Sequence, residues 1–257
     1  MRGLFRADWR LWWVQWYFPL FLLLGAALLL AVTGLDARSM TERMQPLDGS
    51  AAVAPTGRNG VPVTACLILS DGMLLLWGGG ILAAGIVGRG FETRTLGRAL
   101  SRGHSRDAVF WEKLLFCEIL GITLSGISQI LCLLIFAPLS LHFLPRLLQF
   151  FLLHTLADLA VLSIPLFLAF LCRDLIRTVS FSAAHSLLFW AILSGNLAGD
   201  GPAMDVLNLH PLLQLRRILV PTLWGKGDVA SFLIVCITLI LVLHAGAYLL
   251  FRRCEFR

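Results

Sequence analysis

Long unbroken blocks of apolar residues constrain this chain more than any other feature of its sequence. The stretches Leu20 to Leu30 and Phe232 to Leu243 are apolar on every face, whereas a membrane β-strand would alternate apolar and polar residues over about ten positions. A helix of roughly 20 apolar residues crosses the ~30 Å hydrocarbon core of a bilayer and satisfies its backbone hydrogen bonds internally. We therefore expect an all-α integral membrane protein.

The composition agrees with this class and excludes an ordinary water-soluble domain. Of the 257 residues, 58% are hydrophobic and 14% are charged, against roughly 25% charged residues in a typical globular domain. The mean hydropathy is +0.83. A fold surrounded by water could not bury this much apolar surface, so we expect much of the surface to face lipid.

The apolar blocks predict six transmembrane helices in a single domain that covers residues 1–257. The expected spans are residues 13–32, 63–87, 114–136, 147–171, 179–197 and 229–251, and only a tight polar turn beginning at Cys172 separates the fourth from the fifth. Five or seven spans are weaker alternatives. The first apolar stretch is longer than the roughly 7 to 15 residues of a signal-peptide core, so we expect this span to be retained.

The positions of the basic residues predict the orientation. Six spans place both termini on one side of the membrane, and 14 of the 21 Lys and Arg residues fall on that side. Because cytoplasmic loops carry the excess of Lys and Arg, we expect both termini to lie in the cytoplasm. We expect a multi-pass protein of the inner (cytoplasmic) membrane of a bacterium. The net charge of +6 reflects this topology and contact with anionic membrane lipids, and it gives no reason to expect a nucleic-acid partner.

Sequence motifs for independent catalysis are missing. The six cysteines contain no C-x-x-C pair, and neither an H-E-x-x-H motif nor a G-x-x-x-x-G-K-[ST] phosphate-binding loop occurs. These patterns would mark a metal or disulfide framework, a zinc protease and an ATP site, respectively. We therefore expect no catalytic residues and no metal site in this chain, which is not predicted to be an enzyme.

The most informative segment lies between the second and third predicted spans. Three arginines recur there every four positions, and small or apolar residues collect on another helical face. We therefore predict a short amphipathic helix over about residues 91–102, ended by Gly103, with Ser105 as the N-cap of the helix that enters the membrane near Trp111. The arginines are Arg94, Arg98 and Arg102, and the other face holds Leu96, Ala99, Leu100 and Gly103.

With its surrounding topology, this segment resembles the coupling helix of ABC-2 type transporter permeases, the membrane subunits of ATP-binding cassette exporters. Those permeases have six helices with both termini inside. Between the second and third they show an acidic residue, a threonine and a leucine, small residues, a Ser-Arg pair and a lysine that begins the third span. The matching residues, in order, are Glu92, Thr95, Leu96, Leu100, Ser101, Ser105, Arg106 and Lys113. Arg94 departs from the pattern, because many members have glycine before the threonine.

The resemblance implies that this chain works with other proteins. Its coupling helix would dock on a separate ATPase subunit, which would bind ATP and magnesium, so no cofactor is expected in this chain. A second permease chain, identical or homologous, would complete the exporter, and the substrate would be a hydrophobic or amphipathic peptide, drug or lipid. The ATPase-coupling residues would be Phe91, Glu92, Arg94, Thr95, Leu96, Arg98, Leu100, Arg102, Ser105 and Arg106. From the residues alone, the arginines could instead grip anionic lipid head groups, at about 1 kcal/mol each.

A second amphipathic segment lies between the fifth and sixth predicted spans. Residues 205–223 are too polar to cross the membrane and amphipathic enough to lie at its outer surface. Pro211 marks the start of a helix within this segment. ABC-2 permeases often carry short re-entrant helices at this place, and an ordinary surface loop with an apolar underside fits equally well.

Ionisable residues inside the predicted spans need partners. His154 and Asp158 are four residues apart and share a helix face. They support an alternative function, a stand-alone ion-coupled carrier or an intramembrane enzyme, although a mutually satisfied pair that faces another helix is the simpler interpretation. Small residues in the predicted spans are expected to mark close helix packing rather than a pore; they are Gly78, Gly79, Gly80, Gly85, Gly121 and Gly126. The ionisable candidates are Asp71, Glu118, His154, Asp158, His185 and His244.

Overall fold

The described part of the chain is built of helices. The computed structural model describes residues 75–136, 144–194, 209–219 and 228–255. Every regular element in these ranges is helical, so the predicted all-α class is confirmed. The predicted first span, the part of the second before residue 75, and Asp71 lie outside the described residues, as do residues 205–208 and 220–223 of the predicted outer segment.

Residues 75–83 are helical and continue directly into a π-helix, η1. The elements in chain order are η1 (Ala84–Gly88), α4 (Arg89–Glu92), α5 (Thr95–Ser101), α6 (Arg106–Phe136), α7 (Leu144–Cys172), α8 (Leu175–Ser194), α10 (Pro211–Leu219) and α12 (Val229–Arg252). The third predicted span lies within α6 and the fourth within α7. α8 covers the described part of the fifth span, and α12 is one residue longer than the predicted sixth.

Two of the described helices are long and apolar enough to cross a membrane. They are residues Phe151–Cys172 of α7 and the whole of α12, and α8 adds a shorter apolar stretch over Leu175–Phe189. The two long segments differ in burial, since 56% of the apolar window of α7 is buried but only 11% of that of α12. α7 is therefore a core helix, and α12 lies at the periphery with many of its apolar side chains exposed. The six-span topology stays a prediction.

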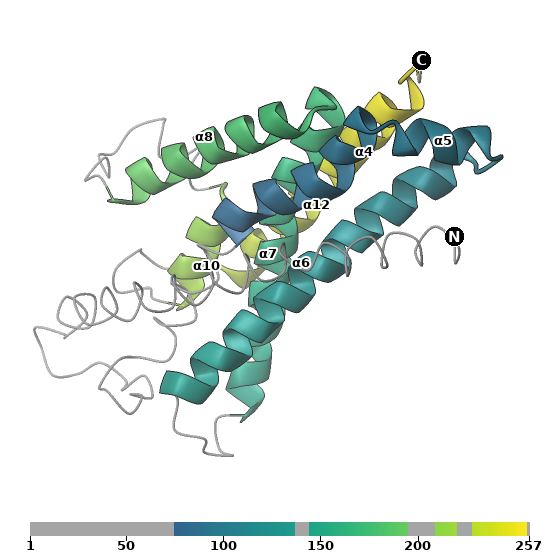
Figure 1. The fold of residues 1–257 in the computed structure, drawn as a ribbon. Coiled ribbons are helices and arrows are strands. Elements are labelled where there is room, and N and C mark those ends of the chain that lie inside the picture. The colour runs from purple at the N-terminus through teal and green to yellow at the C-terminus, as the bar shows by residue number, and fades with distance from the viewer. Residues whose placement is uncertain (1–74, 137–143, 195–208, 220–227, 256–257) are drawn as a thin grey trace, which may run out of the picture.

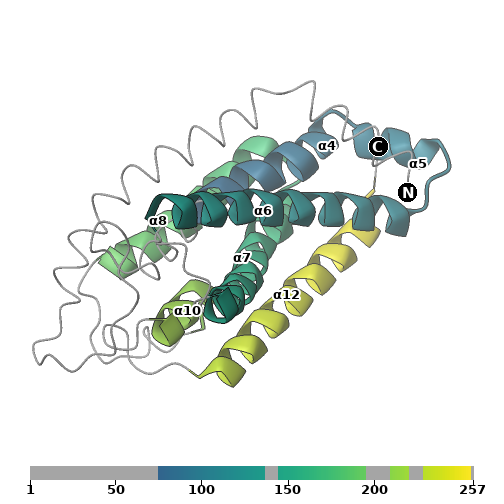
Figure 2. The ribbon, with the colours of Figure 1, turned by 90° about the horizontal axis from the view of Figure 1, so that it is seen from below.

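α7 lies at the centre of the bundle. It packs against η1, α6, α8, α10 and α12, more partners than any other described helix has. Figures 1 and 2 show α4, α5 and the C-terminal end of α12 together at one end of the bundle, with α10 toward the opposite end. The predicted coupling segment therefore lies at the end of the bundle where α6 begins and α12 ends.

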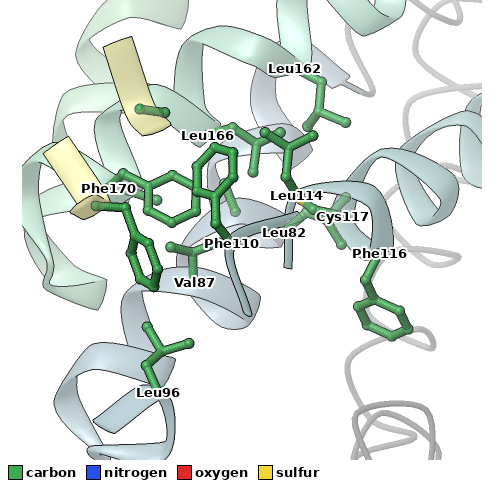
Figure 3. Close-up of a cluster of buried hydrophobic side chains, with 14 of the residues drawn as sticks. Leu82, Val87, Leu96, Phe110, Leu114, Phe116, Cys117, Leu162, Leu166 and Phe170 are labelled. Carbon is green, nitrogen blue, oxygen red and sulfur yellow. The ribbon is translucent and has the colours of Figure 1, made fainter. Parts of the chain in front are cut away.

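Two buried apolar clusters hold the helices together. The cluster at the α5 end joins η1, α6, α7 and α12, and its side chains include Phe110, Phe170 and Phe251. Figure 3 shows Phe110 and Phe170 side by side in this cluster. The other cluster joins α7 to α10 and α12 through residues such as Leu212 and Phe232. Burying one such side chain fully contributes about 1.5–3 kcal/mol, so both clusters matter for stability.

Glycines allow the helices to approach closely, as predicted. A Cβ atom at Gly121 of α6 would overlap the Leu162 side chain of α7, and one at Gly80 would overlap Ser182 of α8. The backbone of η1 also approaches the turn before α8, because a Cβ atom at Gly88 would lie 3.0 Å from the carbonyl oxygen of Asp174. These contacts are packing contacts, which agrees with the interpretation made from the sequence.

Candidate functional site

The predicted coupling segment folds as two short helices, so the expectation of one helix over residues 91–102 was wrong. α4 ends at Glu92 and α5 begins at Thr95. Between them, Arg94 adopts the left-handed conformation, with φ 55° and ψ 22°. A non-glycine residue rarely adopts this conformation, so the break is a specific feature of the backbone. It occurs at the position where many ABC-2 permeases have glycine, which suits this conformation at no steric cost.

Burial of Leu96 explains the break. Its side chain is 1% exposed and belongs to the core cluster, and Gly90 leaves the space, since a Cβ atom there would lie 3.2 Å from Leu96 Cγ. Thr95 Oγ1 donates a hydrogen bond to the carbonyl oxygen of Gly90 at 3.1 Å, and Arg98 Nη2 donates to that of Thr93 at 2.6 Å. Side chains of α5 thus satisfy carbonyl groups that the end of α4 leaves open.

The end of the segment agrees with the sequence prediction. Gly103 has a φ of 86°, which glycine adopts without strain. α6 begins at Arg106, and the backbone N–H of Ala108 donates to Ser105 Oγ at 3.2 Å. Ser105 therefore caps α6, as expected.

Phe91 anchors the segment to the bundle. Its ring contacts Phe170 of α7 and Phe251 of α12 edge to face, with centroid separations of 6.3 Å and 6.2 Å. Phe110 of α6 lies 5.0 Å from Phe170 and 5.8 Å from Phe251 between ring centroids. Such pairs contribute about 0.5–1.5 kcal/mol beyond their buried area. The cluster therefore ties the short helix α4 to three long helices.

Glu92 links the segment to a fourth helix. Its Oε1 atom accepts a hydrogen bond from the backbone N–H of Leu175, the first residue of α8, at 2.7 Å. Asp174 Oδ1 accepts from the backbone N–H of Arg177 at 2.7 Å. Two carboxylates thus satisfy open N–H groups at the positive end of the α8 dipole.

The start of α6 holds the end of α12. Arg106 Nη1 donates to the carbonyl oxygens of Arg252 and Cys254 at 2.6 Å and 2.9 Å. The hydroxyl of Tyr248 donates to Asp107 Oδ1 at 2.9 Å. A cation at the C-terminal end of a helix donates hydrogen bonds to the open carbonyl groups and interacts favourably with the negative end of the helix dipole. Arg106, placed by the resemblance among the ATPase-coupling residues, thus has a role inside the fold.

The outward face of the segment is basic. Arg94, Arg98 and Arg102 are exposed, whereas Leu100 is half-buried and packs against the core cluster. The predicted division into a charged face and an apolar face is therefore present, with Arg94 just before α5 rather than within a helix. Lys113, the last residue of the matching pattern, is largely buried, and its Nζ lies 3.7 Å from Glu112 Oε2.

A separate polar cluster is buried between α6 and α7. Asp158 Oδ2 accepts a short hydrogen bond from Ser125 Oγ, and Gln129 Nε2 donates to Ser125 Oγ at 3.0 Å. His154 Nδ1 lies 3.7 Å from Asp158 Oδ2. All four side chains are buried. The predicted His154–Asp158 pair therefore faces another helix, and its partners on that helix were missed, although Ser125 and Gln129 are themselves four residues apart.

The other candidate ionisable residues lie elsewhere. Glu118 Oε1 lies 3.1 Å from His244 Nε2, and the same His244 nitrogen is 3.3 Å from Ser163 Oγ, so this contact joins α6, α7 and α12. The ring of His185 on α8 stacks on that of His210, with 5.6 Å between their centroids. Glu118 thus belongs to a different contact from His154 and Asp158.

Metal ligands do not come together in the described parts of the chain, where no group of three His, Cys, Asp or Glu side chains could hold an ion. No protein-family model matches this chain, and no curated protein matches it significantly.

Proposed function

We propose that this chain is the permease subunit of an ABC-2 type exporter of the cytoplasmic membrane. It would move a hydrophobic or amphipathic peptide, drug or lipid, with energy from a separate ATPase subunit. The observation that carries the proposal is the construction of α5. This helix is fixed to the bundle by buried Leu96 while Arg98 and Arg102 face outward. A helix that only held lipid head groups would not need this attachment to the core.

The attachment suits transmission of force. Phe91 contacts α7 and α12, and Glu92 contacts α8. A displacement of the α4–α5 unit would therefore act on three helices at once, and packed helices move as rigid bodies because a dense core resists deformation. In the proposed exporter, closure of the ATPase subunits around ATP and magnesium would push this unit, and the bundle would tilt.

The remaining surface suits lipid and a second permease chain. Large apolar side chains of α12, including Ile234, Leu241 and Val242, are exposed. In a bilayer they would contact lipid tails or the second permease, identical or homologous. Both termini would be cytoplasmic, on the same side as α5, and α10 would lie near the outer surface.

The buried cluster around His154 and Asp158 supports a second candidate function less well. An ion-coupled carrier or an intramembrane enzyme needs an accessible polar centre. Here Asp158 is hydrogen-bonded to Ser125, both are nearly inaccessible to solvent, and the helices around them are tightly packed. Transport by proteoliposomes that contain this chain alone, without ATP, would support the carrier.

Site-specific crosslinking tests the exporter proposal. We expect an ABC ATPase to be encoded beside this gene and to copurify with the chain after co-expression. A photo-crosslinking residue at Arg98 or Ser101, both exposed on α5, is expected to crosslink to that ATPase. The same residue at Leu241, exposed on α12, is the matched control and is expected to crosslink to lipid or to a second permease. The proposal fails if no complex forms, or if the complex crosslinks from α12 but not from α5.

A further inference from the structure

A pocket of about 470 Å³ opens beside α5, lined among others by Phe91, Arg94, Arg98, Arg173 and Glu255. Its walls come from the α4–α5 unit, from the turn between α7 and α8, and from the turn that follows α12. These segments are far apart in the sequence, so the pocket exists only when the bundle is folded. Its inner side rests on the aromatic cluster, because Phe91 packs on Phe170 and Phe251.

Two arginines of the pocket have an unusual backbone conformation. Arg94 and Arg173 each have a φ of 55°, and in the described residues they are the only non-glycine residues with a positive φ. This conformation is unfavourable for an L-residue, because its Cβ atom lies too close to the carbonyl oxygen that follows. Strained residues of this kind persist where the surrounding structure holds them, and they concentrate at ligand-binding sites. That both occur in one pocket, on separate chain segments, points to a binding role.

The charges in the pocket favour an anionic ligand. Among the described residues, neither Arg94 nor Arg173 forms an ion pair. The nearby carboxylate of Glu92 accepts the N–H of Leu175 at the start of α8. Guanidinium groups bind carboxylates with two parallel hydrogen bonds, and such charge-assisted bonds are stronger than neutral ones.

We propose that this pocket receives a carboxylate side chain from a loop of the ATPase subunit, an inference that rests on the proposed function. Glu92 and Glu255 also line the pocket, so its rim carries both signs of charge. A protein loop can match a mixed rim, with an acidic residue facing the arginines and a polar or basic residue facing Glu255. A phosphatidylglycerol head group carries no cation to face these carboxylates, so the mixed rim favours the protein loop.

Binding in this pocket would let the ATPase subunit contact two segments of this chain at once. A carboxylate bound between Arg94 and Arg173 would touch the α4–α5 unit and the α7–α8 turn together. The load would then reach α8 directly, as well as through the hydrogen bond from Leu175 to Glu92.

Glycine substitutions test the pocket without endangering the fold. Arg94→Gly and Arg173→Gly remove the guanidinium groups, and glycine accepts a φ of 55° without strain. Arg177→Gly and Arg253→Gly are the controls, because these arginines are exposed close to the turns that form the pocket and are not part of the pocket lining. The affinity of each full-length variant for the ATPase subunit is measured in detergent at two salt concentrations. Thermal unfolding and retention of phosphatidylglycerol are measured in parallel.

We expect the double variant Arg94→Gly/Arg173→Gly to bind the ATPase at least tenfold more weakly with no loss of thermal stability, and each control to stay within about twofold. A charge pair that the complex buries contributes more than one that stays exposed to solvent. A Lys substitution of one acidic residue on the ATPase should abolish the difference between the double variant and the unsubstituted chain. Equal affinities for pocket and control variants would overturn the inference and leave the proposed function intact. Loss of phosphatidylglycerol without loss of ATPase binding would assign the pocket to lipid and also overturn it. If the unsubstituted chain fails to bind the ATPase, the proposed function itself fails.

Discussion

The carboxylate of Glu92 accepts a hydrogen bond from the backbone N–H of Leu175 at 2.7 Å. This bond joins the end of α4 to the first residue of α8, although the two residues lie 83 positions apart in the chain. It makes Glu92 a cap of α8 in addition to a residue of the proposed coupling segment. A single side chain thus connects the expected docking surface to the start of α8.

Replacing Glu92 should therefore affect stability and coupling together. We expect Glu92→Ala to lower the free energy of unfolding by about 0.5–2 kcal/mol, the usual cost of removing a helix cap. Glu92→Gln keeps an acceptor oxygen and should lose less. Thermal unfolding in detergent measures the first effect, and ATPase stimulation in the reconstituted complex measures the second. Equal stability of Glu92→Ala and the unsubstituted chain would show that the bond does not cap α8.

Arg94 and Arg98 should respond in opposite ways to glycine. Arg94→Gly is expected to leave the free energy of unfolding unchanged or to raise it by about 1 kcal/mol, because the left-handed conformation no longer opposes a side chain. Arg98→Gly lies inside α5 and is expected to lower it by about 1 kcal/mol, since glycine is a poor helix former. Parallel thermal unfolding of the two variants makes this comparison. A larger loss for Arg94→Gly than for Arg98→Gly would contradict the observed break between α4 and α5.

The close approach of α6 and α7 predicts a size limit at Gly121. Gly121→Ala would place a methyl group onto Leu162, and such overpacking costs about 1–3 kcal/mol. Gly126→Ala is the control, because its Cβ would lie 3.6 Å from Phe151, an ordinary contact. Combining Gly121→Ala with Leu162→Ala should cost less than the sum of the two single changes. Additive losses would argue against the contact.

The boundaries of several elements could be predicted because local signals determine them. The apolar block of α12 ends within one residue of the observed helix, and Ser105 and Gly103 act as the cap and stop that their residue types favour. The break at Arg94 could not be predicted, because arginine carries no signature of a left-handed conformation. That conformation follows from burial of Leu96 against helices far away in the sequence.

The buried polar cluster was predictable in part, for a similar reason. The four-residue spacing of His154 and Asp158 places them on one face of α7 in any helix. The face of α6 that contacts them depends on how α6 packs on α7, and this packing cannot be predicted from the local periodicity of the sequence. Ser125 was therefore found only in the structure.

Asp158 and Ser125 should prove energetically coupled. Asp158→Ala leaves the Ser125 hydroxyl without this acceptor in the protein interior, and a buried polar group left unsatisfied costs about 1–3 kcal/mol. Asp158→Asn keeps an acceptor oxygen and should cost less. A double-mutant cycle with Ser125→Ala, followed by thermal unfolding in detergent, should give a coupling energy of about 1 kcal/mol or more. A coupling energy of zero would mean that the two side chains act independently.

Asp228 makes the start of α12 sensitive to acid. Hydrogen bonds from the backbone N–H and hydroxyl of Ser231, and from the backbone N–H of Ala230, hold the pKa of Asp228 below its usual range. A carboxyl group with a lowered folded-state pKa stabilises the fold above its unfolded-state pKa, and this stabilisation is lost as the pH falls through the folded-state value. We therefore expect the chain to lose stability below about pH 4, the ordinary Asp range. In Asp228→Asn, which keeps the cap without the charge, the pH-dependent loss should be smaller, as thermal unfolding between pH 3 and pH 7 would measure.

The ring cluster of Phe91, Phe170 and Phe251 also bears on biosynthesis. A ribosome makes Phe91 long before Phe251, and the bond from Arg106 to Arg252 closes a separation of 146 residues. The ring cluster that supports the α4–α5 unit is therefore complete only after α12 has been translated and inserted into the membrane. In the proposed exporter, a nascent or truncated chain would present the basic residues of α5 on an incomplete support, so it would compete poorly with complete chains for the ATPase subunit.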